Sequence, residues 1–83
     1  MLPIILAAYT SQCAPSPDAY AQLIQNFREQ RLTLAMQSDG TVLEVWGNPD
    51  SKTWTMLITA PNGTSCAVAA GQGLEIFPVE PNV

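Results

Sequence analysis

The sequence contains no histidine, and only 12% of its 83 residues are charged. Histidine is the commonest general base and the commonest metal ligand in proteins, so its absence removes the most usual route to acid–base catalysis. Three basic residues stand against seven acidic ones, which gives a net charge of −4. Binding to nucleic acid or to an anionic membrane surface needs clustered Lys and Arg, so we expect neither as a partner.

Other patterns that carry chemistry are also missing. The Gly71-Gln72-Gly73 stretch lacks the further residues of a phosphate-binding loop, and the polar loop 47–52 lacks the spacing of a calcium loop. Glu44 and Glu75 are the acids expected inside strands, where paired carboxylates could act as acid and base, but we interpret them as solvent-facing strand residues. We therefore predict no enzyme, no catalytic residue, no metal site and no cofactor.

The two cysteines, Cys13 and Cys66, lie 53 positions apart, and neither belongs to a CxxC motif. We predict a disulfide between them; the alternative is two buried free thiols in a reducing compartment. In the chain-entropy model, closing a loop of this size stabilises the fold by about 4 kcal/mol, which is comparable to the whole stability of a small domain. Disulfides persist in oxidising environments, so the expected location is a virion or extracytoplasmic, either periplasmic or secreted.

Residues 1–12 form an apolar arm. The arm has the apolar run of a signal peptide but no basic start and no cleavage motif, and it is too short for a membrane helix. Exposed apolar side chains would be adhesive in solution, so the arm is expected to pack against a neighbouring subunit or along its own sheet. We predict that it binds a partner through Leu2, Ile4, Ile5 and Leu6.

Residues 13–77 are predicted to form a single α+β domain that starts with one helix. Ser16 has the character of an N-cap, because proline and aspartate follow it. An apolar stripe at helical spacing then predicts an amphipathic helix that runs to about Gln30; its members are Tyr20, Leu23, Ile24 and Phe27.

Alternation with a period of two begins at Leu32 and predicts strands over 32–37, 41–46, 53–60 and 64–70. Asp39-Gly40 and Asn62-Gly63 are typical of hairpin turns. A short edge strand is expected over 74–77, and residues 78–83, which contain two prolines, are expected to form a tail. The predicted fold is one N-terminal helix packed on a four- to five-stranded antiparallel sheet.

The sequence indicates which residues form strands more clearly than it indicates which face of each strand is buried. Trp54, Met56 and Ile58 share one side of their strand and are predicted to face the core. Trp46 shares the parity of Glu44, which leaves both a core position and an exposed one open, and we include it among the partner-binding residues. The small residues of 64–70 favour close packing under the helix.

An ordered set of motifs lies between Cys13 and about Ile76: Phe27-Arg28-Glu29, Glu44-Val45-Trp46, Thr53-Trp54-Thr55, Pro61-Asn62-Gly63, Cys66 and Ala69-Ala70-Gly71. With Cys13 before the helix, this order resembles a group of small proteins of alphaproteobacteria and of the phages that infect them, to which no activity is assigned. Many members of that group begin with a full signal peptide, whereas this sequence has a short apolar arm, and this departure favours a member associated with a phage or another particle.

These features predict a non-catalytic structural or interaction module. It would be a subunit of a larger assembly, such as a minor or decorating phage virion protein, with other protein subunits as its partners. The alternative is a free-standing periplasmic or secreted small binding protein or inhibitor, which would expose Trp46 beside the 47–52 loop.

Overall fold

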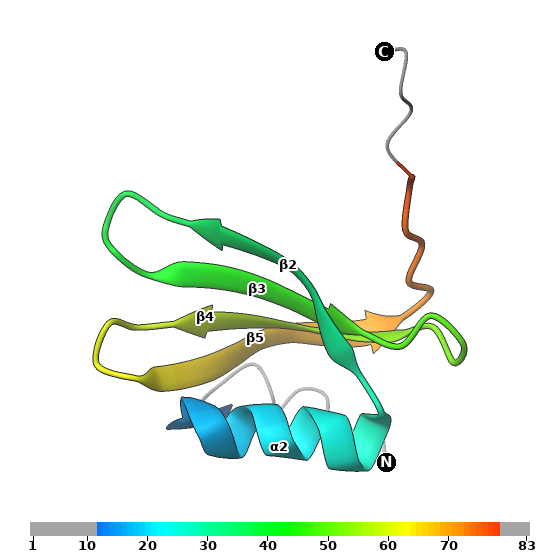
Figure 1. Ribbon diagram of the computed structural model, residues 1–83, viewed down its shortest axis with the longest axis horizontal. Helices are drawn as coiled ribbons and strands as arrows, with labels where there is room; N and C mark the ends of the chain where they lie inside the picture. Colours follow the sequence, from blue (N-terminus) through cyan, green and yellow to red (C-terminus); the bar gives the residue numbers. More distant parts are fainter. Residues whose placement is uncertain (1–11, 79–83) are drawn as a thin grey trace.

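The structure is a computed structural model that describes residues 12–78, and it has two layers, one helix on one sheet. The five strands form an antiparallel sheet in the order β1-β5-β4-β3-β2, and α2 lies on one of its faces (Figure 1). This confirms the predicted α+β fold. The elements are β1 (Gln12–Pro15), α2 (Ser16–Phe27), β2 (Gln30–Met36), β3 (Val42–Gly47), β4 (Thr53–Thr59) and β5 (Thr64–Gln72).

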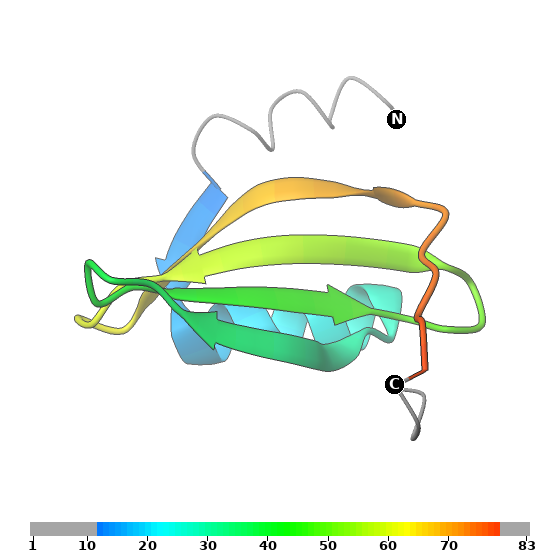
Figure 2. The same cartoon turned by 90° about the horizontal axis from the view of Figure 1, so that it is seen from above.

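The helix α2 connects the two opposite edges of the sheet. It follows β1, at one edge, and leads to β2, at the other, so it crosses one face of the sheet (Figure 2). From β2 onwards the chain forms a simple meander in which each strand pairs with the next. We call the covered side the helix face and the opposite side the outer face.

The fifth strand lies at the N-terminal end of the described chain and not at 74–77, where the sequence predicted it. Residues 73–78 have no regular secondary structure and run across the ends of the strands (Figure 2). The N–H of Leu74 donates to the carbonyl of Lys52, at 3.1 Å. A Cβ on Gly47 would lie 2.7 Å from Leu74 Cδ2 and 2.9 Å from Leu32 Cδ1, so the glycine lets both leucines pack over the strand.

The helix boundaries differ from the prediction at both ends. Ser16 is the first helical residue, and Pro15, which has no side-chain cap, takes the N-cap position. The hydroxyl of Ser16 is engaged across the structure instead, with the carbonyl of Gly63 at 3.0 Å. The helix ends at Phe27, because Arg28 adopts a left-handed backbone with φ 53° and turns the chain towards β2.

Both predicted hairpin turns are present. Gly40 and Gly63 have φ of 91° and 90°, a conformation that costs other residues energy. The first turn is closed by a bond from the N–H of Gln37 to the carbonyl of Thr41, at 2.8 Å. These turns fix the registers of the hairpins that they close.

Few apolar side chains are buried. Leu23 on α2, Trp46 on β3 and Leu57 on β4 form the core cluster. Within the predicted helical stripe, Leu23 is buried, whereas Ile24 and Phe27 are 52% and 51% exposed. The hydrophobic contacts between the two layers are therefore limited.

The predicted core face of β4 is wrong. Thr55 and Leu57 are buried on the helix face, and the register places Trp54, Met56 and Ile58 on the outer face. Side-chain size favours the face that carries Trp54 and Met56, but the helix face also contains the buried carboxylate of Glu44, which requires hydroxyl donors.

The predicted disulfide is confirmed. Cys13 lies directly opposite Cys66 in the β1–β5 pair, and their Sγ atoms are 2.08 Å apart. The neighbouring Ser65 is buried on the helix face, so strand alternation directs Cys66 towards the outer face. The bond attaches the four-residue strand β1, and with it the start of α2, to β5.

Removal of this bond tests its contribution to stability. The Cys13→Ala/Cys66→Ala double variant is expected to lose about 2–4 kcal/mol of unfolding free energy, because its unfolded chain is no longer constrained. Urea unfolding followed by tryptophan fluorescence measures this loss. Wild-type protein under reducing conditions is the control and should behave like the variant; equal midpoints for the variant and the oxidised protein would contradict the prediction.

Candidate functional site

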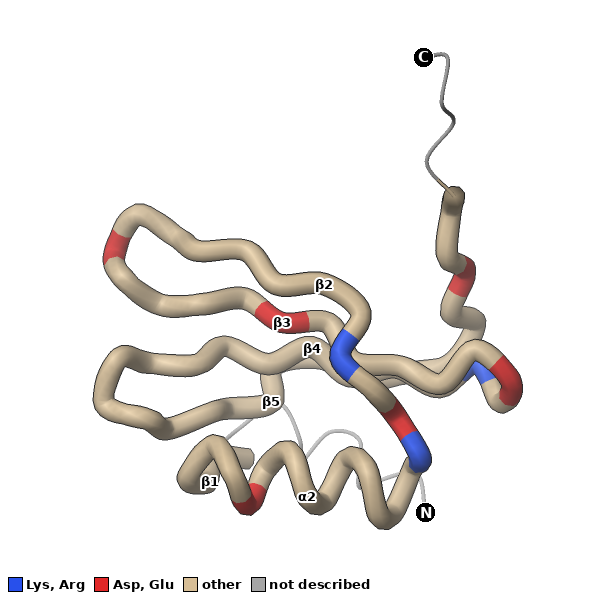
Figure 3. Tube along the Cα trace, in the orientation of Figure 1, with Lys and Arg blue, Asp and Glu red and all other residues tan. Residues whose placement is uncertain are grey.

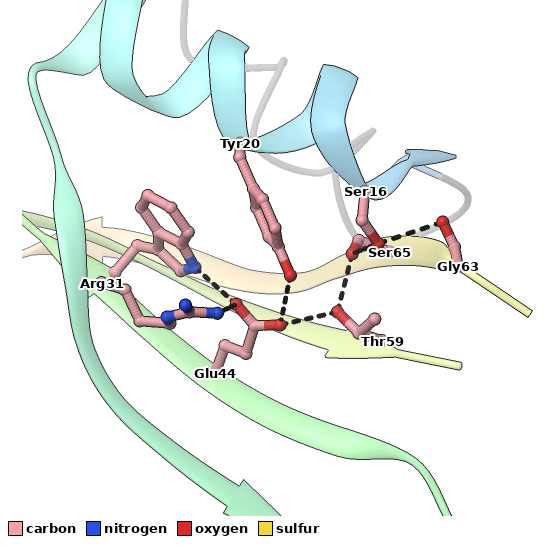
Figure 4. A network of polar contacts seen from close by, with 8 residues as sticks. Ser16, Tyr20, Arg31, Glu44, Thr59, Gly63 and Ser65 are labelled. Atoms are coloured by element: carbon pink, nitrogen blue, oxygen red, sulfur yellow. Dashed lines mark hydrogen bonds and ion pairs between the residues drawn. The ribbon is translucent and has the colours of Figure 1, made fainter. Parts of the chain in front are cut away.

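The side chain of Glu44 lies between the helix and the sheet and is only 1% exposed. Its Oε2 accepts hydrogen bonds from the hydroxyls of Tyr20, at 2.7 Å, and Thr59, at 2.9 Å (Figure 4). Its Oε1 accepts from Trp46 Nε1, at 2.9 Å, and from Arg31 Nη1, at 3.3 Å. A carboxylate has about four acceptor sites, and all of them are occupied here.

The four donors come from four different elements. Tyr20 lies on α2, Arg31 on β2, Trp46 on β3 and Thr59 on β4. The Tyr20 and Trp46 rings stack with their centroids 4.9 Å apart, and the Arg31 guanidinium carbon lies 5.7 and 5.8 Å from the two centroids. The carboxylate, the cation and the two rings therefore form one compact cluster.

A chain of hydroxyls extends this cluster towards the start of the helix. Thr59 Oγ1 lies 2.6 Å from Ser65 Oγ, which lies 2.7 Å from Ser16 Oγ (Figure 4). The carbonyl of Gly63 also accepts the backbone N–H of Ser16, at 2.8 Å. Thr59 donates to Glu44, and Ser65 can donate to Thr59, whereas the single hydroxyl hydrogen of Ser16 goes to the carbonyl of Gly63.

Opposing influences determine the ionisation of Glu44. Burial on its own raises the pKa of Glu44, but hydrogen bonds from Tyr20, Trp46 and Thr59 and the charge of Arg31 together outweigh it. The pKa of Glu44 is therefore lowered, and the carboxylate is held in its charged form.

A second buried glutamate lies in the connection between α2 and β2. Glu29 is 2% exposed, and its Oε1 has no hydrogen-bond partner. Burial raises the pKa of Glu29, and hydrogen bonding to the side chains of Thr55 and Thr53 opposes that rise only in part. The two buried carboxyls therefore shift in opposite directions.

The structure does not bring the predicted acid pair together. Glu44 is buried on the helix face, which corrects the expectation of a solvent-facing residue, and Glu75 is exposed in the segment after β5. Of the two positions left open for Trp46, the structure shows the core one, because this residue is 5% exposed and belongs to the core cluster; its role in partner binding stays a prediction. Four further predicted partner contacts lie outside the described residues: Leu2, Ile4, Ile5 and Leu6.

A groove of about 320 Å³ runs between the helix and the β1 side of the sheet. Leu23, Phe27, Leu57 and Ala67 contribute to its apolar lining, and no titratable side chain lines it. Within residues 12–78 there is no cluster of three or more potential metal ligands among His, Cys, Asp and Glu. No helix in that range has the length and hydropathy to cross a membrane.

The outer face of the sheet is apolar over its centre. A patch of five partly exposed side chains lies on β3 and β4, and no charged residue occurs in β4 or β5 (Figure 3). Trp54 belongs to this patch: its ring lies on the backbone of Gly71, and its Nε1 donates to the carbonyl of Gln72, at 3.2 Å. We call this set the outer patch: Leu43, Val45, Trp54, Met56 and Ile58.

Large apolar side chains are also exposed elsewhere on the described chain. They lie on α2, on β2, on β5 and in the segment after β5: Ile24, Phe27, Leu34, Met36, Val68, Ile76 and Phe77. Because three apolar side chains of residues 12–78 are buried, much of the apolar content of this described part lies on its surface.

No protein-family model, curated protein or solved structure matches this chain. The resemblance drawn from the motifs therefore stays a prediction. Apart from the shared parity of Glu44 and Trp46, no sequence pattern indicated the network around Glu44, because its other members come from distant segments.

The Glu44→Gln substitution tests the buried cluster. An amide offers one acceptor oxygen in place of two, so donors remain unpaired, and we expect a loss of about 3–5 kcal/mol of unfolding free energy at pH 7. Because the folded pKa of Glu44 is lowered, its stabilisation is present above the ordinary glutamate pKa and is lost as the pH falls through the folded value. Urea unfolding across the acidic range measures both effects; Glu75→Gln, on the surface, is the control and should change little.

The Glu29→Gln substitution is expected to act in the opposite direction. Because the folded pKa of Glu29 is raised, the wild-type protein loses stability as the pH rises through that value, where a buried charge forms. The neutral amide avoids this cost, so the variant should be more stable than wild type at pH 7, by about 1–3 kcal/mol. The gain should vanish at low pH; a gain of equal size at every pH would show that ionisation is not the cause.

Proposed function

We propose that this chain is a non-catalytic interaction module that works as a subunit of a larger protein assembly in an oxidising compartment. The observation that carries the proposal is the outer patch, an apolar sheet surface without charged side chains. Contiguous apolar surface is uncommon on proteins that act as monomers and marks protein interfaces, whose centres are depleted in charge.

The chemistry of the buried polar groups supports a structural role for them. All acceptor sites of Glu44 are used by Tyr20, Arg31, Trp46 and Thr59, so the carboxylate has no free lone pair for a substrate. A carboxylate held in this way orients the helix and the strands around it. In an interaction module, the bonds to Glu44 would keep the sheet rigid, so that it presents a fixed outer surface.

The disulfide supports a location outside the reducing cytoplasm, since Cys13 and Cys66 are joined. Within that range we favour a particle surface, as a minor or decorating virion protein, on the basis of the motif resemblance. The alternative of a free-standing binding protein relied on an exposed Trp46, and that ring is buried.

The Met56→Glu variant tests the outer patch. Met56 lies between Trp54 and Ile58 on the outer face, so a charge there should weaken association at least tenfold while the helix face stays intact. Sedimentation velocity of the full chain over a wide concentration range measures association, and circular dichroism checks the fold. Gln25→Glu adds the same charge on the exposed side of α2 and should leave association unchanged.

Two results would count against the proposal. A wild-type chain that sediments as a monomer at every concentration would contradict it directly. Equal association by the Met56→Glu variant and by wild type would remove the outer patch as the surface involved.

A further inference from the structure

The outer edge of β2 has no pairing partner among residues 12–78. Within this described part, β2 is the last strand of the sheet and pairs with β3. The N–H of Gln37 bonds to Thr41 in the hairpin, and antiparallel bonding alternates along a strand, so Ala35 and Thr33 also bond towards β3. The N–H and C=O groups of Leu34 and Met36 therefore point away from the sheet.

This edge lacks the features that usually keep sheet edges apart. No charged residue and no proline occurs between Leu32 and Ser38, and the β2 bulge lies before this stretch, between Arg31 and Thr33. Leu34 and Met36 are 54% and 73% exposed. The opposite edge differs, because β1 has only four residues and ends in Pro15.

The helix leaves this part of the sheet uncovered. Figures 1 and 2 show the turn end of the β2–β3 hairpin projecting beyond the start of α2, in agreement with the exposure of Leu34 and Met36. Leu34 and Met36 lie opposite Glu44 and Val42, so they belong to the helix face. A neighbouring strand at this edge would bring side chains alongside the two residues and would satisfy their backbone groups.

We propose that β2 pairs antiparallel with β2 of a second copy of this chain, about a two-fold axis at Ala35. The inference rests on the proposed function and names the partner at one surface. In this register Leu34 of one copy lies opposite Met36 of the other, and both residues have outward-pointing backbone groups, as a hydrogen-bonded pair requires. The contact is self-complementary, as a two-fold interface must be.

The regular part of β2 selects this register over its neighbours. With the axis at Ala35, the paired stretch is 33–37, which lies between the bulge at Arg31 and Thr33 and the turn that begins at Ser38. If Leu34 lay opposite itself, Met36 would face Leu32 in the bulge. If Met36 lay opposite itself, Leu34 would face Ser38 in the turn.

Cysteine crosslinking of the full chain tests the pairing and its register. In the proposed register Ala35 faces its own copy in a non-hydrogen-bonded pair, where Cα atoms are about 4.5 Å apart and a disulfide can form. The Ala35→Cys variant, mildly oxidised, should give a disulfide-linked dimer on non-reducing electrophoresis. Thr33→Cys is the matched control on the same face, and it lies opposite Gln37, so it should crosslink far more slowly.

A second variant tests the edge without a new thiol. Leu34→Lys adds one cation to β2 of each copy at the proposed interface. It should weaken dimerisation at least tenfold, measured by sedimentation velocity. The substitution leaves the bonds between β2 and β3 in place, because the N–H of Leu34 points outward. Gln25→Lys adds the same charge on the helix and should have no effect.

The outcomes separate this inference from the proposed function. Suppose that the wild-type protein associates and that Met56→Glu weakens this association. If Ala35→Cys then crosslinks no faster than Thr33→Cys, the edge pairing is overturned and the proposed function stands. If wild type is monomeric at every concentration, both are overturned. Faster crosslinking of Ala35→Cys together with weaker association of Leu34→Lys would support the pairing.

Discussion

The need to satisfy one buried carboxylate determines how the two layers of this protein meet. A charge removed from water is costly unless it is paired and hydrogen-bonded, so the Glu44 network forms only when every donor is in place. Its donors, Tyr20, Arg31, Trp46 and Thr59, lie on the helix and on three strands. Three buried apolar side chains would permit many placements of α2, and directional bonds to Glu44 select one.

The features that could be predicted from the sequence depend on local chemistry or on simple counting. Gly40 and Gly63 identified their turns because each tight turn requires a positive φ at one residue, and this requirement does not depend on the rest of the fold. The disulfide followed because two cysteines without a metal or redox motif have one obvious pairing. The helix followed from the spacing of its apolar residues, although its last turn did not, because Arg28 breaks the helix without a glycine.

The features that could not be predicted depend on contacts between distant segments. The alternation in β4 allows either face to be buried, and the larger side chains of Trp54 and Met56 favoured the wrong one. The presence of Glu44 on the neighbouring strand favours the face that carries Thr59, and nothing local to β4 reveals it. Trp46 was ambiguous for the same reason, since its burial depends on which way the carboxylate points.

The position of the disulfide also affects what happens when the backbone is cut. Cys13 and Cys66 enclose the helix and strands β2 to β4 within one covalent ring. The exposed hairpin tip at Asp39 is the kind of place where proteases cleave. A single cleavage inside the ring leaves the two fragments joined by the disulfide, so one cut does not separate the helix from the sheet.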